Sequence, residues 1–371
     1  MSVSIINFTR ITFFIPHFFW VLNSLAVSDS LVIKNSIEFR YTHGVLIPHQ
    51  EGMKELSKGN VKGIELALGI KSGGQKSWSK SFNYPSYGIG YQLMDIGNQK
   101  YLGFSHSIIP YISFNFSHYT SPSCFQLRVG TGLSYFTKTY NSFSNPENIA
   151  ISTPLNVAIN ISGEASYRIM ESGDIFASGN LMHYSNGSYK KPNAGLNIIS
   201  FSAGFRKLFN TSKIPHSVSQ TGNLRNHRIL LTGSFSQKEE KDPGGEKFSV
   251  FSGSVDYSKF IAQQVRLGIT LDIMKDNGNR IILEQNGVTV KNELEILKVG
   301  GTTQVEVVLD RLSALFGLGI YIYNKNTDNK LLYQRVGLRY KFTNRFYSQI
   351  ALKTHWNLAD YIEFGVGIDI I

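Results

Sequence analysis

The chain has 371 residues, a net charge of +11 and a single cysteine, and only 17% of its residues are charged, against about a quarter in ordinary soluble domains. One cysteine excludes an internal disulfide framework. A mean hydropathy of −0.11 excludes a bundle of membrane-spanning helices. An aromatic fraction of 13% together with 34 glycines is typical instead of a β-barrel of a bacterial outer membrane.

The positive charge has two interpretations. The simpler one is a basic surface with no specific partner. The other is attraction to an anionic surface, such as phosphorylated lipid head groups. Nucleic acid is disfavoured as a partner, because no run of lysines and arginines is interleaved with aromatic residues.

The N-terminus has the layout of an export signal. Arg10 precedes an apolar run over residues 11–22, and small residues follow at 26–28. This pattern predicts a signal peptide over residues 1–28. The apolar run is short and is interrupted by Pro16, so it is poorly suited to anchor the chain across a membrane.

The rest of the chain alternates strictly between apolar and polar residues. Ile64, Leu66 and Leu68 share one face of their segment, for example, whereas Glu65 and Ala67 share the other. A period of two over such lengths predicts half-buried β-strands. The first half predicts eight strands, at residues 34–43, 61–72, 86–95, 102–117, 124–137, 155–168, 174–184 and 195–209.

A polar segment, residues 210–226, predicts a linker between a first domain, 29–209, and a C-terminal region, 227–371. The second region predicts eight more strands, at residues 227–237, 246–258, 264–275, 293–309, 313–324, 331–342, 346–356 and 360–371. These strands are long enough to cross a bilayer at a tilt. We therefore expect an all-β, antiparallel transmembrane barrel fold, either as two eight-stranded barrels or as one sixteen-stranded ring.

Charge runs are few in this sequence. The clearest is Lys-Glu-Glu-Lys-Asp at residues 238–242, which is followed by Pro-Gly-Gly. Proline and glycine favour turns. The run therefore predicts a solvated loop between two strands.

One predicted strand end carries side chains used in nucleophilic catalysis. His183 and Ser185 are two residues apart, so they share a face if the strand continues through the serine. An imidazole close to a hydroxyl can take its proton and activate the serine as a nucleophile. The simpler interpretation of an isolated His-x-Ser is a solvated turn.

The predicted topology places this pair on the outer wall of a barrel. With the N-terminus in the periplasm, the seventh strand runs outward and ends at His183. The face that carries His183 and Ser185 also carries Ile175 and Leu181, so we expect it to face lipid. Asn197, on the eighth strand, lies on a similar apolar face. Polar residues on a lipid-facing wall are costly and indicate a functional site.

The stretch from His183 to Asn197 resembles the PagL-like lipid A 3-O-deacylases, outer-membrane enzymes that are also described as acyloxyacyl hydrolases. The resemblance rests on His-x-Ser-Asn followed by Pro-Asn-x-Gly at residues 192–195, and it covers residues 34–209. It implies an esterase that removes the 3-hydroxyacyl chain at position 3 of lipid A, without a metal or other cofactor. It also implies lipopolysaccharide as the substrate and the bacterial outer membrane as the location.

The same resemblance implies the catalytic roles. His183 is the general base and Ser185 is the nucleophile. The acid of the family falls on Asn197, which is a departure from the pattern. An asparagine can orient an imidazole by accepting its N–H, but it cannot stabilise the imidazolium by charge.

The turn after the strand is expected to stabilise the oxyanion. By the resemblance, Asn193 is the main donor, with help around Gly187 and Asn186. Lys190 and Lys191 either contact the phosphates of lipid A or belong to a solvated turn.

The sequence also offers two other histidines near this site and an alternative function. His43 and His49 lie on a neighbouring outer loop and are expected to be ordinary loop histidines. The alternative function is a non-enzymatic barrel, porin-like or adhesive, that keeps the motif without a functional acid. A wide lumen would favour that alternative, and a narrow first barrel filled by side chains would favour the enzyme.

Overall fold

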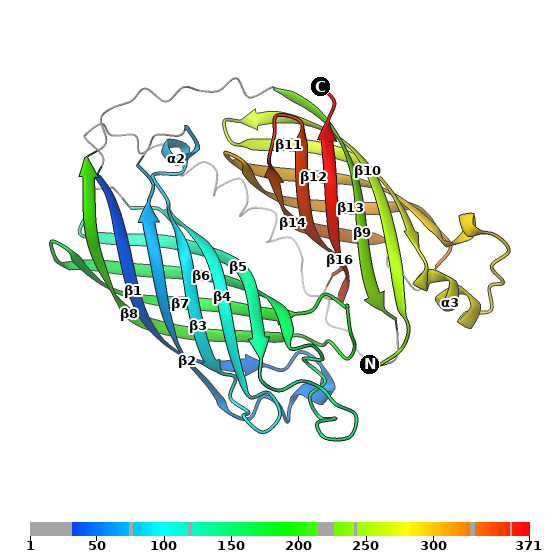
Figure 1. Cartoon of the computed structure of the whole chain (residues 1–371), viewed down its shortest axis with the longest axis horizontal. Helices are drawn as coiled ribbons and strands as arrows, with labels where there is room; N and C mark the ends of the chain where they lie inside the picture. The colour runs from blue at the N-terminus through cyan, green and yellow to red at the C-terminus, as the bar shows by residue number, and fades with distance from the viewer. Residues whose placement is uncertain are drawn as a thin grey trace, which may run out of the picture.

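The two halves of the chain form two separate closed barrels, as Figure 1 shows. Each barrel has eight antiparallel strands among the described residues. The computed structural model describes residues 32–73, 77–117, 121–213, 226–240, 243–326, 331–356 and 358–371. The predicted signal peptide and residues 214–225 of the predicted linker lie outside the described residues. The all-β barrel prediction is confirmed, and of its two arrangements the structure has the tandem barrels rather than the single ring.

The first barrel closes because β1 pairs with both β2 and β8. A 3₁₀ turn, η2 (Glu51–Met53), and a short helix, α2 (Ser77–Ser81), lie in its loops. Its strands are β1 (Val32–Ile47), β2 (Asn60–Lys71), β3 (Ser86–Asp95), β4 (Phe104–Asn115), β5 (Ser123–Phe136), β6 (Leu155–Met170), β7 (Gly173–Ser185) and β8 (Leu196–Lys213).

The second barrel closes in the same way, because β9 pairs with both β10 and β16. A helix, α3 (Gly278–Gln285), and a 3₁₀ turn, η3 (Glu293–Ile296), lie between β11 and β12. Within the described ranges, no helix is both long and apolar enough to cross a membrane. The strands are β9 (His227–Glu239), β10 (Lys247–Ala262), β11 (Val265–Asp276), β12 (Leu297–Leu309), β13 (Leu312–Asn324), β14 (Leu332–Lys341), β15 (Phe346–His355) and β16 (Leu358–Asp369).

The alternation of the sequence becomes two distinct faces of each wall. On β2, Ile64, Leu66 and Leu68 are exposed on the outside, whereas Glu65 is buried in the lumen. Closed barrels pair every strand and leave no open sheet edge. Apolar residues outside and polar residues inside are the arrangement that a lipid-facing barrel requires.

Ion pairs cross the lumen of the first barrel. Arg40 on β1 bonds Glu164 on β6 at 2.7 Å, and Arg128 on β5 bonds Glu65 on β2 at 2.5 Å. Arg206 on β8 also bonds Glu164, at 2.5 Å. Because all three contacts join strands that are not neighbours in the wall, side chains fill the middle of this barrel and leave it without a wide channel.

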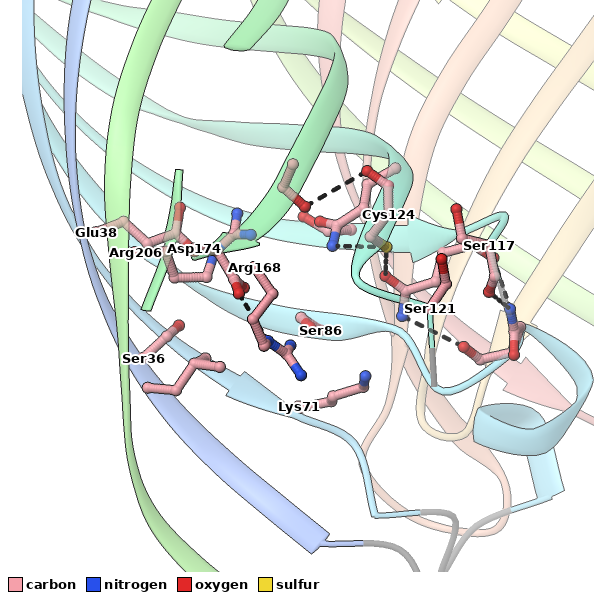
Figure 2. A pocket seen from close by; sticks show the side chains of 16 residues that line it. Ser36, Glu38, Lys71, Ser86, Ser117, Ser121, Cys124, Arg168, Asp174 and Arg206 are labelled. Carbon is pink, nitrogen blue, oxygen red and sulfur yellow. Dashed lines mark hydrogen bonds and ion pairs between the residues drawn. The ribbon is translucent and has the colours of Figure 1, made fainter. Parts of the chain in front are cut away.

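A small polar pocket of about 110 Å³ lies at one end of the same lumen (Figure 2). Its lining includes Lys71, Arg168 and Asp174, and the last two form an ion pair at 3.0 Å. Asp174 is at the start of β7, whereas His183 is near the end of that strand. The pocket is therefore at the opposite end of the barrel from the predicted catalytic residues.

The lumen of the second barrel is also crossed by ion pairs. Arg335 on β14 bonds Asp272 on β11 at 2.9 Å and Glu363 on β16 at 2.8 Å. Arg339, four residues further along the same face of β14, bonds Glu306 on β12 at 2.8 Å. Inward positions of both barrels thus carry charges that neutralise one another.

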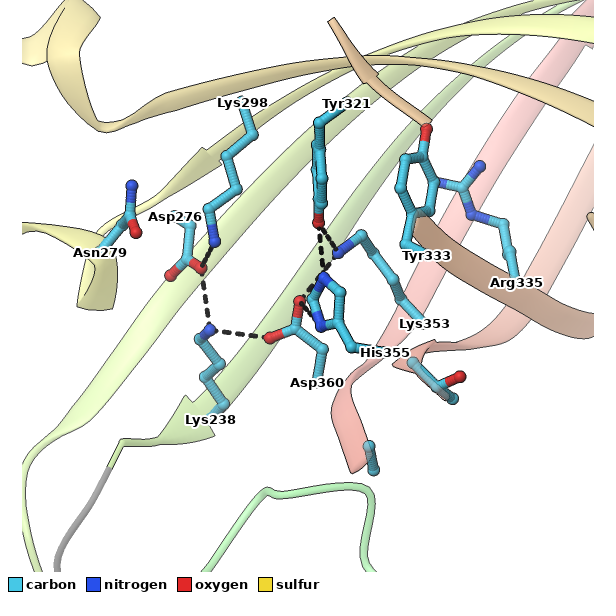
Figure 3. Close-up of polar contacts among 12 residues, drawn as sticks. Lys238, Asp276, Asn279, Lys298, Tyr321, Tyr333, Arg335, Lys353, His355 and Asp360 are labelled. Atoms are coloured by element: carbon cyan, nitrogen blue, oxygen red, sulfur yellow. Dashed lines mark hydrogen bonds and ion pairs between the residues drawn. The ribbon is translucent and has the colours of Figure 1, made fainter. Parts of the chain in front are cut away.

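The charge run at residues 238–242 is the place where the sequence-based prediction was wrong. β9 continues to Glu239, and both Lys238 and Glu239 are only 4% exposed. Lys238 points into the second barrel, where it lies between Asp276 at 2.8 Å and Asp360 at 2.9 Å (Figure 3). These inward-facing partners, which are distant in sequence, keep Lys238 out of solvent. Glu239, on the other face of β9, instead bonds the loop that follows β7.

Substituting Glu164→Ala should destabilise the first barrel by about 3–5 kcal/mol, because two buried guanidinium groups lose their partner. The measurement is the midpoint of thermal unfolding in detergent micelles, monitored by the change in gel mobility between the folded and unfolded protein. Glu55→Ala is the control, since Glu55 pairs with Lys58 where both side chains are more than half exposed. Its loss should cost less than about 1 kcal/mol. Equal midpoints for the two variants would contradict a structural role of the lumen network.

Candidate active site

The predicted catalytic residues lie at the end of β7 and the start of β8, on the outer face of the first barrel. Ile175 and Leu181 are exposed on this face of β7, and Phe176 and Met182 on the other face are buried. His183 continues the outward series, as the alternation requires. Ser185 ends the strand and is 8% exposed, because the loop that follows covers it.

His183 is held by the neighbouring strand. β7 and β8 pair with His183 directly opposite Asn197, and Nδ1 of the imidazole lies 2.6 Å from Oδ1 of the amide. An amide oxygen can only accept, so Nδ1 carries the proton. The other ring nitrogen, Nε2, is then left with the lone pair that a general base needs.

His49 holds the other end of the Asn197 amide. Its Nε2 lies 2.9 Å from the carbonyl oxygen of Ala194, which can only accept, so Nε2 carries the proton. Its Nδ1 then accepts from Nδ2 of Asn197 at 3.1 Å. A longer approach of 3.4 Å to the carbonyl oxygen of Ile47 is the weaker competitor for the same nitrogen. The two histidines therefore fix which end of the amide faces His183.

The sequence-based reading treated His49 as an ordinary loop histidine and missed this contact. The register between β1 and β8 is the signal that could have predicted the contact between His49 and Asn197. Ile47, the last residue of β1, pairs with Asn197 on β8, so the loop that follows β1 starts beside that amide. This register depends on barrel closure, which alternation alone does not specify.

Two hydrogen-bond donors converge on the Ser185 hydroxyl. Nδ2 of Asn193 donates to Oγ at 2.9 Å, and the backbone N–H of Gly187 donates at 3.1 Å. Oδ1 of Asn193 accepts from the backbone N–H of Asn186 at 3.2 Å, which fixes the orientation of that amide. An oxyanion that forms next to Oγ would be within reach of both donors.

The side chain of Asn186 is occupied elsewhere. Its Nδ2 donates to Oγ of Ser152 at 3.0 Å and to the carbonyl oxygen of Lys190 at 2.9 Å. It therefore closes the β7–β8 loop and ties it to the β5–β6 loop. Of the three predicted oxyanion residues, the structure brings Asn193 and the backbone of Gly187 onto Ser185, and it directs the Asn186 side chain away.

His183 and Ser185 share a face, but no hydrogen bond joins them in the described part of the chain. The bond between base and nucleophile is often long in a ligand-free enzyme and shortens when substrate binds. Within the described residues, no group of three or more His, Cys, Asp or Glu side chains is placed to hold a metal ion.

Gly195 lies so close to the imidazole of His183 that a side chain at this position would crowd the ring. It has φ +74°, and a Cβ there would lie 3.0 Å from the carbonyl oxygen of Tyr184 and 3.1 Å from Cε1 of His183. Positive φ strains any residue with a side chain. Glycine is thus needed both for the end of the loop and for the position of the ring.

The second barrel holds the loop that follows Ser185. Oγ of Ser188 donates to the carbonyl oxygen of Ala359 at 2.7 Å, and the backbone N–H of Glu239 donates to the carbonyl oxygen of Ser188 at 3.0 Å. The carboxylate of Glu239 accepts from the backbone N–H of Lys191 at 2.6 Å. The loop is therefore clamped between β9 and β16 of the second barrel. The predicted contact of Lys190 and Lys191 with phosphate stays a prediction.

Substituting Gly195→Ala should lower the reactivity of Ser185 by about tenfold or more, because a Cβ displaces the imidazole and strains the loop by about 1–3 kcal/mol. The measurement is the rate of labelling by a fluorophosphonate, which reacts with activated serines. Gly179→Ala is the control on the same strand, since a Cβ there approaches only Phe201, at 3.9 Å. Equal labelling of both variants would show that Gly195 does not position the base.

Solved structures with a related barrel share little sequence with the chain. Neisserial surface protein A (NspA) is 14% identical over 47% of this chain and 97% of that one, with a TM-score of 0.33. CdiB from Acinetobacter baumannii is 9% identical over 90% and 60%, with a TM-score of 0.19. A mutant of the Rh. blastica porin is 7% identical over 91% and 100%, with a TM-score of 0.18. The chain has no match among curated proteins.

Two family models match the chain, one for each barrel. Residues 62–206 match the lipid A 3-O-deacylase (PagL) family, and residues 225–370 match the C-terminal domain of acyloxyacyl hydrolase, also described as PagL_C. The matched ranges contain the ends of β7 and β8 that meet at His183 and Asn197, and all eight strands of the second barrel. The chain belongs to the PagL family of lipid A deacylases and carries the C-terminal domain of its acyloxyacyl hydrolase members.

Proposed function

We propose that the chain is an outer-membrane esterase that removes an ester-linked 3-hydroxyacyl chain from lipid A of lipopolysaccharide. The observation that carries the proposal is the convergence around Ser185: two donors reach its Oγ, and an oriented imidazole lies on the same face. The site is on the outer wall, at the end of a strand, where the ester bonds of a membrane lipid lie within reach. Membership of the PagL family supports the substrate.

The reaction is acyl transfer to Ser185 followed by hydrolysis. Oγ attacks the ester carbonyl carbon, and its proton passes to Nε2 of His183. The carbonyl oxygen becomes an oxyanion and accepts from Nδ2 of Asn193 and the N–H of Gly187. His183 then returns the proton to the departing sugar oxygen. Water attacks the acyl-serine with His183 as base, which releases the hydroxy fatty acid and restores Ser185.

Asn197 and His49 keep the imidazole in the tautomer that this reaction needs. If an asparagine presented its nitrogen to Nδ1 of His183, the proton would sit on Nε2 and the base would be lost. The bond from Nδ2 of Asn197 to His49 keeps the amide oxygen toward His183. The amide supplies orientation without charge, so the imidazolium is stabilised less than it would be by a carboxylate.

The structure gives little support to a porin-like function. A pore needs an open lumen, whereas Arg40–Glu164 and Arg335–Glu363 are among the ion pairs that fill the two barrels. A narrow first barrel filled by side chains favours the enzyme over the porin-like alternative.

Mass spectrometry of lipid A is the first test. A bacterium that makes the chain should lose one hydroxyacyl chain from its lipid A, and Ser185→Ala should abolish the loss, with a fall in rate of about three orders of magnitude or more. Equal amounts of both proteins in the outer-membrane fraction are the control. Unchanged lipid A with the wild-type chain, present in that fraction, would refute the proposed substrate.

The role of His49 can be tested with a double-mutant cycle that combines substitutions of His49 and Asn197. His49→Ala should lower kcat by about tenfold with little change in KM, because the amide is then free to turn. Asn197→Asp should raise kcat, since a carboxylate adds charge beside the imidazolium. In the Asn197→Asp background, His49→Ala should have a much smaller effect, because the two oxygens of a carboxylate are equivalent. The same loss in both backgrounds would mean that His49 is merely structural.

A further inference from the structure

The outer wall of the second barrel contains a groove of about 710 Å³. Small and large side chains alternate along it, so that the large ones flank hollows left by the small ones. Volumes of about 300–1,000 Å³ are usual for sites that hold small ligands. Six of the residues that line it are Gly233, Phe235, Tyr340, Ser348, Ile350 and Phe364.

The groove faces outward and not into the lumen. Phe364 and Val366 on β16 are 59% and 68% exposed, whereas Glu363, the residue before Phe364, is buried and bonds Arg335 inside the barrel. The groove is therefore on the apolar surface that meets the hydrocarbon of the membrane. An apolar chain is the ligand that such a surface can bind.

The groove begins beside the loop that carries the proposed nucleophile. A Cβ on Gly187, two residues after Ser185, would lie 2.4 Å from Cγ1 of Ile362 and 3.6 Å from Cδ1 of Leu352. Those two residues are paired across β15 and β16. Their wall is thus in direct contact with the active-site loop.

The same two strands continue from that contact into the groove. The next outward residues are Ile350, two before Leu352, and Phe364, two after Ile362; they are paired with each other and both line the groove. Residues i and i+2 of a strand share a face and are roughly 7 Å apart. The groove therefore starts one such step from the pair that contacts the loop. It extends away from the loop toward the far end of the wall, where Tyr340 and Ser348 line it.

The clamp between the barrels fixes the groove relative to Ser185. Ser188 bonds the backbone of Ala359 on β16, and Glu239 on β9 bonds the backbone of both Ser188 and Lys191. β9 and β16 are also walls of the groove. Two of the strands that shape the groove thus hold the loop of the nucleophile.

We infer that this groove on the second barrel binds an acyl chain of the lipid substrate. The bound chain is the one whose ester bond lies at Ser185. The inference rests on the proposed function and gives the C-terminal domain a part in it. An ester at the level of the strand ends carries a hydrocarbon chain that must run toward the middle of the membrane, which is the direction of the groove. The second barrel then contributes to the choice of the chain that is cleaved.

The direct test is photo-crosslinking in the full-length Ser185→Ala variant. The probe is lipid A with a diazirine in a 3-hydroxyacyl chain, mixed into phospholipid vesicles that contain the protein. Crosslinks should concentrate in peptides that cover residues 346–352 and 360–366, well above other outward-facing peptides of the second barrel. An even spread over the lipid-facing wall would overturn the inference.

Two matched glycines supply the control. Gly233 lines the groove, and Gly253 is its partner in register on β10 but is not part of the lining. A Cβ at either position meets nothing within 4 Å, so a side chain can leave the backbone at both positions without a clash at its first atom. Gly233→Leu should reduce the groove crosslinks and the deacylation of lipid A by about fivefold or more, whereas Gly253→Leu should change neither. Equal effects of the two substitutions would refute a specific groove.

The two proposals can fail separately. Groove crosslinks without deacylation by the wild-type chain would leave the acyl-chain site in place and refute the deacylase. Deacylation that depends on Ser185, with even crosslinks and no effect of Gly233→Leu, would keep the enzyme and refute the groove. A short water-soluble ester separates catalysis from chain binding, since Gly233→Leu should leave its hydrolysis unchanged.

Discussion

The pairing of backbone polar groups in a lipid environment is the constraint on which this structure depends. A strand in hydrocarbon must give every N–H and C=O a partner, and closed barrels do so without an edge. Closure in turn forces alternate residues outward and inward. Polar side chains on the outer wall are therefore costly unless they satisfy one another, and His183, Asn197 and Ser185 are each bonded by neighbours at the end of the wall.

The site is assembled from segments that only closure brings together. The loop after β1 contributes His49, β7 contributes His183 and Ser185, and β8 contributes Asn197. The amide of Asn197 links the two histidines, since its oxygen faces His183 and its nitrogen faces His49. The second barrel completes the surroundings by holding the loop at Ser188. The geometry of the proposed site is thus a property of both barrels.

Alternation predicted all sixteen strands, because a period of two is a local consequence of one wet and one apolar face. It also predicted the outward direction of His183 and its meeting with Asn197. It could not distinguish two barrels from one ring. A period of two residues shows which side chains share a face, but it does not show which strands pair to close a barrel. His49 and Glu239 were missed for a related reason: their partners come from register and from contact between barrels. Each looks like an ordinary polar loop residue in its local sequence.

The ion pairs across the two lumens have a consequence for the cell that would carry this chain. A large barrel with an open interior raises the permeability of its membrane with every copy inserted. Here Arg206–Glu164 in one interior and Arg335–Asp272 in the other occupy the path that solutes would take. Each further copy in a membrane therefore adds no wide water-filled path through either interior.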